Sequence, residues 1–360
     1  MASIQDSAGP EVRAPASLAV VGSRVDARVR GLLDAELDRW RRIDPDLAAP
    51  LDALRDLVAA GGKRLRPAFC YWAFVGSGAD PAAPVIVDAG AALELLHTFA
   101  LVHDDVMDAS DTRRGLPAVH RRFISQHVDD AWHGESRRYG EGAAVLVGDF
   151  AFVYSDRLVA GIGPEARAVY DELRVELCVG QYLDLVGTAG GTRDRERARR
   201  IERYKSGKYT VERPLHLGAA LAGRYRDLAG SLTEIGIPLG EAFQLRDDLL
   251  GVFGDASVTG KPVGDDLREG KLTPLVAAAA ERVLGADATL LGRLGAVDLT
   301  ADEIASLQDL LDRCGAREEI ERAIGGLVTQ ATRAIHASPL TTDARDALAE
   351  LATFVAYRDR

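Results

Sequence analysis

The stretch LELLHTFALVHDDVMDASDTRRG, residues 93–115, is an apolar segment that ends in clustered charge. If the segment is helical, a rotation of about 100° per residue places Asp104 and Asp108 one turn apart on one face, with Asp105 beside them. Carboxylates this close repel one another, so they need either cations or open water around them. Because an apolar segment leads into the aspartates, we expect them to point into a cavity rather than to bulk solvent.

A second acidic pair, Asp247 and Asp248, follows the similar helical pattern FQLRDDLLG, with Gln244 one turn before Asp248. Gly251 stands where a third acid would complete the spacing of the first cluster, and the next acid is Asp255. On two long helices, the two clusters would face one another across a bundle cavity. Clustered carboxylates are hard oxygen donors of the kind that Mg²⁺ prefers, and Mg²⁺ commonly bridges them to phosphate oxygens. The alternative for each cluster is a solvated acidic surface.

Four basic groups decide between these interpretations, because each stands beside glycines that let the backbone approach a phosphate closely. They occur in GGKRLRP, TRRG, YKSGKYT and TGKPVGDDLREGK. One such group is typical of solvated surface, but four of them beside two aspartate pairs favour phosphate binding. We therefore predict an enzyme that holds two polyphosphate-bearing substrates, one through metal and one through cations directly. The basic residues are Lys63, Arg64, Arg66, Arg113, Arg114, Lys205, Lys208, Lys261 and Lys271.

The rest of the chain predicts a helical protein. Helical periodicity dominates and strand alternation is hardly visible. Because no linker divides the 360 residues, we predict one all-α domain over residues 19–360, after a disordered N-terminal lead-in at 1–18. The polar, glycine-containing stretch 126–142 is predicted to be a long loop. Helices are expected at 89–106, 143–160, 165–186, 193–204, 211–222, 228–252, 272–284, 301–314 and 317–335.

Bulk properties exclude several classes of protein. The net charge of −11 argues against non-specific binding to nucleic acid or to an anionic membrane. No apolar run is expected to span a membrane, and the N-terminus lacks a secretory signal. Cys70, Cys178 and Cys314 are odd in number and far apart, which favours a reducing compartment and a cytoplasmic location.

Rival catalytic sites are weakly supported by the sequence. Glu94 and His97 form one Glu-x-x-His pair, whereas a di-iron bundle needs two such pairs and further glutamates. No GxSxG motif is present, and the cysteines have no local histidine partner.

The stretches GGKRLRP, ELLHTFALVHDDVMDASDTRRG, YKSGKYT, FQLRDDLLGVFGD and GKPVGDDLREGK resemble the trans-isoprenyl diphosphate synthases, or polyprenyl synthetase family. They occur in the family's order over residues 61–271. The resemblance implies an all-α, single-domain helical bundle around a deep central cavity, with two aspartate motifs facing each other at its mouth, in a homodimer. It also implies a head-to-tail condensation of isopentenyl diphosphate with an allylic prenyl diphosphate, dependent on as many as three Mg²⁺ ions.

The resemblance assigns roles to individual residues. As metal ligands it implies Asp104, Asp105, Asp108, Asp247 and Asp248. Around isopentenyl diphosphate it implies Lys63, Arg66, His97 and Arg114. Around the allylic diphosphate it implies Arg113, Lys205, Gln244, Lys261 and Lys271, with Ser206 where many relatives carry threonine. The catalytic set comprises Asp104, Asp105, Asp108, Arg113, Lys205 and Asp248. Gly251 departs from the family's second motif, which puts the third acidic ligand in doubt.

Product length is expected to depend on side chains one or two turns before the first aspartates. A helix rises about 5.4 Å per turn, comparable with one isoprene unit, so these side chains act as a ruler along the growing tail. Ala100 is small and lets the tail pass, whereas Phe99 is bulky; together they predict a short product, geranylgeranyl diphosphate, with farnesyl diphosphate as the alternative. The alternative for Phe99 is that it only fills core space between helices. Two other functions stay open: a class I terpene cyclase, which needs no isopentenyl diphosphate pocket, and a weakly active or regulatory subunit of a heteromeric prenyl synthase.

Overall fold

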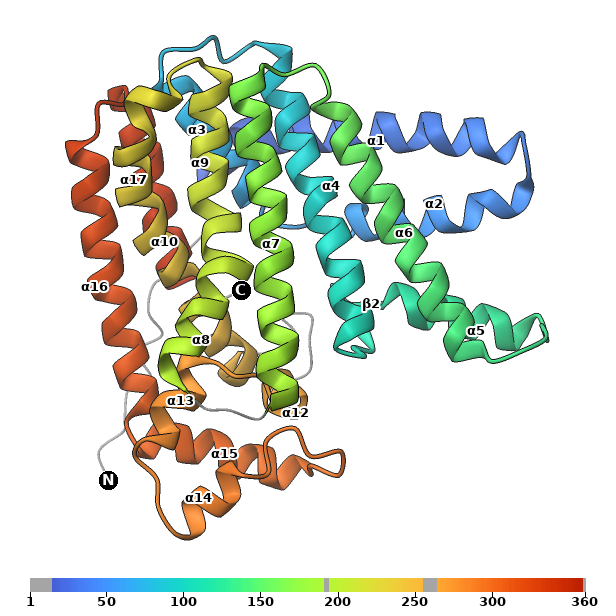
Figure 1. Ribbon diagram of the computed structural model, residues 1–360, viewed down its shortest axis with the longest axis vertical. Coiled ribbons are helices and arrows are strands. Elements are labelled where there is room, and N and C mark those ends of the chain that lie inside the picture. Colours follow the sequence, from blue (N-terminus) through green and yellow to red (C-terminus); the bar gives the residue numbers. More distant parts are fainter. Residues whose placement is uncertain (1–14, 191–193, 255–263, 359–360) are drawn as a thin grey trace, which may run out of the picture.

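The computed structural model describes residues 15–190, 194–254 and 264–358. Helices supply nearly all the regular structure in these residues, which confirms the predicted all-α class. Figure 1 shows long helices running side by side in a bundle, with α1 and α2 extending to one side and the short α14 and α15 at one end.

The order of the elements along the chain is as follows. The first half comprises α1 (Ala16–Arg41), η1 (Pro45–Leu47), α2 (Ala48–Ala59), α3 (Leu65–Gly76), α4 (Pro84–Met107), β1 (Thr112–Arg113), β2 (Leu116–Pro117), α5 (Val119–Asp129), α6 (Ser136–Leu158) and α7 (Pro164–Gly190). The second half comprises α8 (Arg195–Glu202), the π-helix η2 (Arg203–Glu212), α9 (Arg213–Leu221), α10 (Tyr225–Phe253), α12 (Asp265–Glu269), α13 (Pro274–Ala280), α14 (Ala286–Leu291), α15 (Ala301–Arg313), α16 (Ala316–Ala337) and α17 (Thr342–Tyr357).

Helix α4 is the central apolar helix of the bundle. It is apolar on almost every face, as expected of a helix surrounded by other helices, and its residues from Ala89 to Leu96 are buried. By length and composition α4 is apolar enough to cross a membrane, which corrects the expectation that no such run exists. Most of it is buried inside the bundle, however, as in the core helix of a soluble protein. Its carboxyl end carries Asp104 and Asp105 out of the apolar core.

Helix α10 joins the two larger hydrophobic cores among the described residues. Leu239 and Phe243 belong to the larger core, which α1 to α7, α9 and α17 also build. Leu245 and Leu249, farther along α10, belong to a smaller core with α12 to α16. Asp247 and Asp248 therefore lie on a part of α10 that packs against both cores, which holds the position of this helix.

A short hairpin folds the arginines after α4 back towards its aspartates. Strands β1 and β2 pair antiparallel, with Arg113 opposite Leu116. The two residues between them, Arg114 and Gly115, have φ values of 54° and 75°. Positive φ at both positions is typical of a type I′ turn, in which glycine is favoured. The hairpin thereby reverses the chain within a few residues of Asp108.

Two expectations about local structure are corrected. Residues 126–142 do not form a long loop, because α5 runs to Asp129 and α6 begins at Ser136. One of the glycines there serves close helix packing: a Cβ at Gly140 would lie only 2.5 Å from the backbone oxygen of His120. The predicted lead-in also overlaps helix, since α1 begins at Ala16; residues 1–14 lie outside the described residues.

Candidate active site

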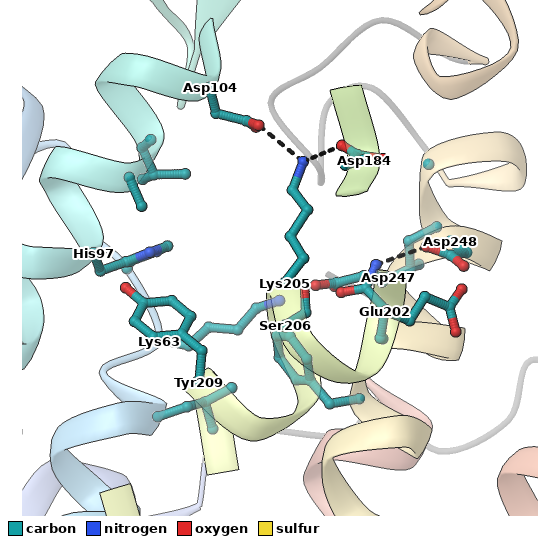
Figure 2. A pocket seen from close by; sticks show the side chains of 18 of the residues that line it. Lys63, His97, Asp104, Asp184, Glu202, Lys205, Ser206, Tyr209, Asp247 and Asp248 are labelled. Carbon is teal, nitrogen blue, oxygen red and sulfur yellow. Dashed lines mark hydrogen bonds and ion pairs between the residues drawn. The ribbon is translucent and has the colours of Figure 1, made fainter. Parts of the chain in front are cut away.

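A cavity of about 830 Å³ lies beside the carboxyl ends of α4 and α10, with α7 and η2 along its wall. Figure 2 shows Asp104 and the Asp247–Asp248 pair on different sides of it. Most of the predicted site residues line this cavity, although they are far apart in the sequence: Lys63, Arg66, His97, Ala100, Asp104, Arg113, Arg114, Lys205, Ser206, Gln244, Asp247, Asp248 and Lys271.

Lys205 is the central cation of the site. Its Nζ lies 2.9 Å from Asp104 Oδ1 and 2.6 Å from Asp184 Oδ2, as Figure 2 shows. Burial alone would raise the pKa of Asp104, but Lys205, Lys271 and Arg113 lower that pKa well below its usual range. Burial would likewise lower the pKa of Lys205, but Asp104 and Asp184 raise it. The cavity therefore contains a fully charged lysine between two carboxylates.

The other aspartates of the first cluster are also held by cations. Arg113 Nε lies 2.8 Å from Asp105 Oδ1, and Asp105 is 1% exposed. Lys271 Nζ lies 3.2 Å from Asp108 Oδ2. Burial and then the charge of Asp104 raise the pKa of Asp108 to about 6. Of these three aspartates, Asp104 lines the cavity. Arg113, Lys205 and Lys271 supply the positive charge that the sequence requires around the cluster.

On the opposite wall, Asp248 is 4% exposed and is oriented by Gln244, whose Nε2 donates to Asp248 Oδ1 at 2.7 Å. The carboxyl group of Glu202 lies within hydrogen-bonding distance of the Asp248 carboxyl group. Burial raises the pKa of Asp248 to about 6. Burial and then Asp248 raise the pKa of Glu202 well above its usual range. Both carboxyl groups would thus be favoured in their ionised form by a nearby cation.

Asp247 is held from the far end of the chain. Arg358 is 1% exposed and donates to Asp247 Oδ1 through Nη2. The same guanidinium donates to the carbonyl oxygens of Val355 at 2.7 Å and Phe243 at 3.3 Å, and it lies 4.3 Å from the centre of the Phe243 ring. A buried cation in so many contacts has little freedom, so it fixes the orientation of Asp247.

A second group of basic residues lines the same cavity and comprises Lys63, Arg66 and Arg114, with His97 among them. The Arg66 guanidinium lies 4.3 Å from the centre of the Tyr209 ring, an arrangement that favours a cation. Burial and then the charge of Arg66 lower the pKa of His97 well below its usual range, so the imidazole is neutral. Burial lowers the pKa of Arg114 to about 10, so its guanidinium stays charged at neutral pH.

The π-helix η2 carries Lys205, Ser206 and Tyr209 to the cavity. Such segments widen the helical turn and are frequent at functional sites. Gly180 on α7 makes room for η2, because a Cβ at position 180 would lie 2.5 Å from Lys205 Cα. The close approach of α7 and η2 brings Asp184 within reach of Lys205.

Some predicted residues are used differently. Phe99 does not line the cavity: its ring packs against α6, with its centre 4.9 Å from that of Phe152. It also lies 4.6 Å from the ring centre of His103, one turn later on α4. Ala100 lines the cavity beneath Asp104. Lys261 lies outside the described residues, so its predicted contact with the allylic diphosphate stays a prediction.

Two charged residues of the sequence motifs are structural. Arg64 Nη1 lies 2.7 Å from Glu94 Oε2, and both side chains are buried. This ion pair removes Glu94 from the di-iron interpretation. Lys208 Nζ lies 2.8 Å from Glu176 Oε1 and 3.2 Å from Glu212 Oε2, and Lys208 is not part of the cavity wall.

Sequence reasoning missed several residues of the site. Gln181 and Asp184 line the cavity from α7. They are polar residues three positions apart, on one face of a predicted helix, and this spacing could have indicated that the face borders a polar site. Gln181 Nε2 donates to Asp104 Oδ1 at 2.9 Å. Glu202 and Arg358 gave no local signal, because their partners lie far away in the sequence.

The donor set fits Mg²⁺. Among the described residues, no three acidic, histidine or cysteine side chains are already arranged around a metal position. Instead, carboxylates face each other across the cavity, and Asp248 Oδ2 is buried with no hydrogen-bond partner. Hard carboxylate oxygens that leave coordination positions for phosphate and water are the usual protein contribution to Mg²⁺ sites.

Comparison with known proteins places the chain in a family. The profile of the polyprenyl synthetase family matches residues 49–311. A short chain isoprenyl diphosphate synthase from Methanothermobacter thermautotrophicus is 34% identical over 86% of this chain and 90% of its own length. A nonaprenyl diphosphate synthase from Mycobacterium tuberculosis is 31% identical over 92% of each chain. The crystal structure of a geranylgeranyl pyrophosphate synthase from Corynebacterium glutamicum, complexed with isoprenyl diphosphate and magnesium, matches with a TM-score of 0.85 and 36% identity, covering 93% of this chain and 99% of that one. The chain therefore belongs to the polyprenyl synthetase family and is a trans-prenyltransferase of the isoprenyl diphosphate synthase type.

Proposed function

We propose that this chain condenses isopentenyl diphosphate with an allylic prenyl diphosphate and releases geranylgeranyl diphosphate. One observation carries the proposal: a single cavity is lined by two groups of basic residues, and one group, Lys205, Arg113 and Lys271, pairs with the aspartates of α4. Two diphosphate groups have places in this cavity. A class I terpene cyclase, which binds one diphosphate, has no use for the second group of basic residues.

The allylic diphosphate is assigned to the region between Asp104 and Asp248. Lys205, Lys271 and Arg113 stand there with their charges fixed by carboxylates. In the reaction, these cations stabilise the negative charge that develops as diphosphate leaves the allylic carbon. When bound, as many as three Mg²⁺ ions held by Asp104, Asp105, Asp108, Asp247 and Asp248 would supply further positive charge to the same group.

Isopentenyl diphosphate is assigned to Lys63, Arg66, His97 and Arg114. Cations there hold the second diphosphate so that its double bond faces the allylic carbon, which converts a bimolecular encounter into a positioned reaction. Neutral His97 can donate one hydrogen bond to a phosphate oxygen without adding charge. The double bond then attacks the allylic cation, a proton leaves to the released diphosphate, and the chain is longer by one isoprene unit.

The proposed product rests on the wall beneath Asp104. Ala100 and Leu101 line the cavity there, so no bulky aromatic side chain from this turn of α4 blocks it. The solved geranylgeranyl pyrophosphate synthase that shares the fold supports the same product. Farnesyl diphosphate is the expected product if the tail is stopped earlier.

Incubation of the purified chain alone with Mg²⁺, isopentenyl diphosphate and each allylic primer tests the proposal. The expected result is geranylgeranyl diphosphate, measured by chromatography after removal of the phosphates. A cyclised hydrocarbon formed without isopentenyl diphosphate would contradict the proposal, as would activity only after addition of a second subunit.

We also propose a homodimer, which exposed apolar side chains on α6 and on α7 support. Val175, Val179 and Tyr182 recur along one face of α7 and are 57%, 43% and 67% exposed, and Leu146 on α6 is 59% exposed. Exposed apolar side chains that recur along one helix face mark an interface, and a second copy of the chain would cover them symmetrically. Light scattering of the native chain should give twice the monomer mass, and Leu146→Asp should shift it to the monomer mass.

The proposed location is a reducing, cytoplasmic compartment. All three cysteines are free, and Cys178 is exposed. An exposed thiol persists best where the surroundings keep thiols reduced.

A further inference from the structure

Another helix fills the position of the acid that is missing at Gly251. A Cβ at 251 would lie 2.6 Å from Asp266 Cγ and would overlap the carboxylate oxygen Oδ2. Asp266 belongs to α12, and its carboxylate therefore occupies the volume that a side chain on α10 would need. The second motif cannot recover its third acid at 251 without displacing Asp266.

Glu202 brings a different carboxylate to the same wall. It is the last residue of α8, at the junction with the π-helix η2, and it lines the cavity with 7% of its surface exposed. Figure 2 shows Glu202 beside Asp247 and Asp248. Its carboxyl group lies within hydrogen-bonding distance of Asp248.

The two carboxyl groups are short of partners. Glu202 Oε1 and Asp248 Oδ2 are both buried, and neither accepts a hydrogen bond from an N–H or hydroxyl donor among the described residues. Buried oxygens without partners are costly, and each such group in a native protein calls for an explanation such as an ion. They point to a cation that binds between them.

Neighbouring cations are already in use. Arg203 Nε lies 2.9 Å from Glu241 Oε1. Lys205 Nζ turns to Asp104 at 2.9 Å, and Arg358 contacts Asp247. These three basic residues therefore do not neutralise Glu202 and Asp248. Arg199, which is exposed one turn earlier on α8, lowers the pKa of Glu202 by less than burial and Asp248 raise it.

We propose that Glu202 helps to bind the divalent cation at Asp248 and supplies from α8 the carboxylate that position 251 lacks. Mg²⁺ is usually held by one or two carboxylates, with phosphate oxygens and waters completing its octahedron. Glu202 and Asp248 provide the two carboxylates, and the bound diphosphate completes the site. This inference rests on the proposed function, because the diphosphate must bring the cation into the cavity.

Binding of Mn²⁺ in the presence of saturating inorganic diphosphate tests the inference without catalysis. Free Mn²⁺ is counted by electron paramagnetic resonance for the native chain, Glu202→Gln, Asp248→Asn and the double variant. Glu202→Gln should weaken one class of Mn²⁺ site roughly ten- to hundredfold. Asp248→Asn should weaken the same class, and the double variant should lose no further class. Glu202→Asp, which withdraws the carboxylate by one methylene, should be intermediate.

Glu241→Gln is the matched control, because Glu241 is a nearby carboxylate that pairs with Arg203 and does not line the cavity. It should bind Mn²⁺ as the native chain does. Native-like Mn²⁺ binding by folded Glu202→Gln would overturn the inference and leave the proposed function intact. The proposed function fails separately, if the native chain forms no prenyl diphosphate from isopentenyl diphosphate and an allylic primer.

Discussion

Gly251→Ala should destabilise this protein, although alanine usually stabilises a helix. By itself, replacing glycine in a helix by alanine gains about 0.5–1 kcal/mol. Here the new Cβ would lie 2.6 Å from Asp266 Cγ, where ordinary contacts begin at 3.4 Å, so the carboxylate must retreat and its contact with Lys271 Nζ at 3.7 Å changes. Overpacking of this kind costs about 1–3 kcal/mol. We therefore expect a net loss between about 0 and 2.5 kcal/mol, centred on about 1 kcal/mol, from these two opposing effects.

A double-mutant cycle with Asp266→Ala isolates the contact. Urea unfolding of the metal-free native chain, the two single variants and the double variant, at one protein concentration, gives the coupling free energy. We expect a coupling of about 1–3 kcal/mol, with Gly251→Ala stabilising the Asp266→Ala background. If Gly251→Ala stabilised the native chain and the Asp266→Ala chain equally, the coupling free energy would be zero and the proposed overlap would be refuted. Gly251→Asp should also fail to raise turnover, because the added acid overlaps Asp266 rather than completing the motif.

Three further predictions follow from the site. Asp108→Asn should stabilise the metal-free protein at pH 7.5 by up to about 3 kcal/mol. The folded protein raises the pKa of Asp108 to about 6, so ionisation of this carboxyl group lowers the free energy of unfolding as the pH rises from about 4 through 6. Urea unfolding at pH 7.5 and at pH 4 should therefore show the gain only at the higher pH. Ala100→Phe should shorten the product, whereas Phe99→Ala should change it less because Phe99 packs on α6; identical product lengths in both variants, by chromatography, would remove Ala100 from the account. Arg358→Met should raise the Mg²⁺ concentration needed for half-maximal rate, because Asp247 loses its orienting partner, and Arg358→Lys should restore part of the effect; an unchanged Mg²⁺ dependence would assign Arg358 to stability alone.

The features that could be predicted from the sequence are those set by neighbours along one helix. The apolar run before Asp104 predicts the buried helix α4, and the spacing of its aspartates predicts a charged end at a cavity. The basic groups near glycines predict the phosphate-binding walls, since Lys63 and Lys205 both line that cavity.

The features that were missed depend on pairs far apart in the chain. Arg358 and Asp247 meet only because α17 packs beside α10, and Glu202 reaches Asp248 only through the junction of α8 with a π-helix. Neither contact follows from a periodic pattern of residues in the sequence. Likewise, the glycines of residues 126–142 predict a loop by composition, whereas Gly140 serves the close packing of α6 on α5.

The central claim is that the aspartates of α4 act on a diphosphate in this cavity. Its most direct test is the steady-state incorporation of labelled isopentenyl diphosphate by the native chain and by Asp104→Asn, at saturating Mg²⁺ and saturating allylic primer. The account predicts that turnover of Asp104→Asn falls roughly a hundredfold or more, while its circular dichroism spectrum stays native, because stabilisation of the leaving diphosphate is lost. Turnover of Asp104→Asn close to that of the native chain would contradict it.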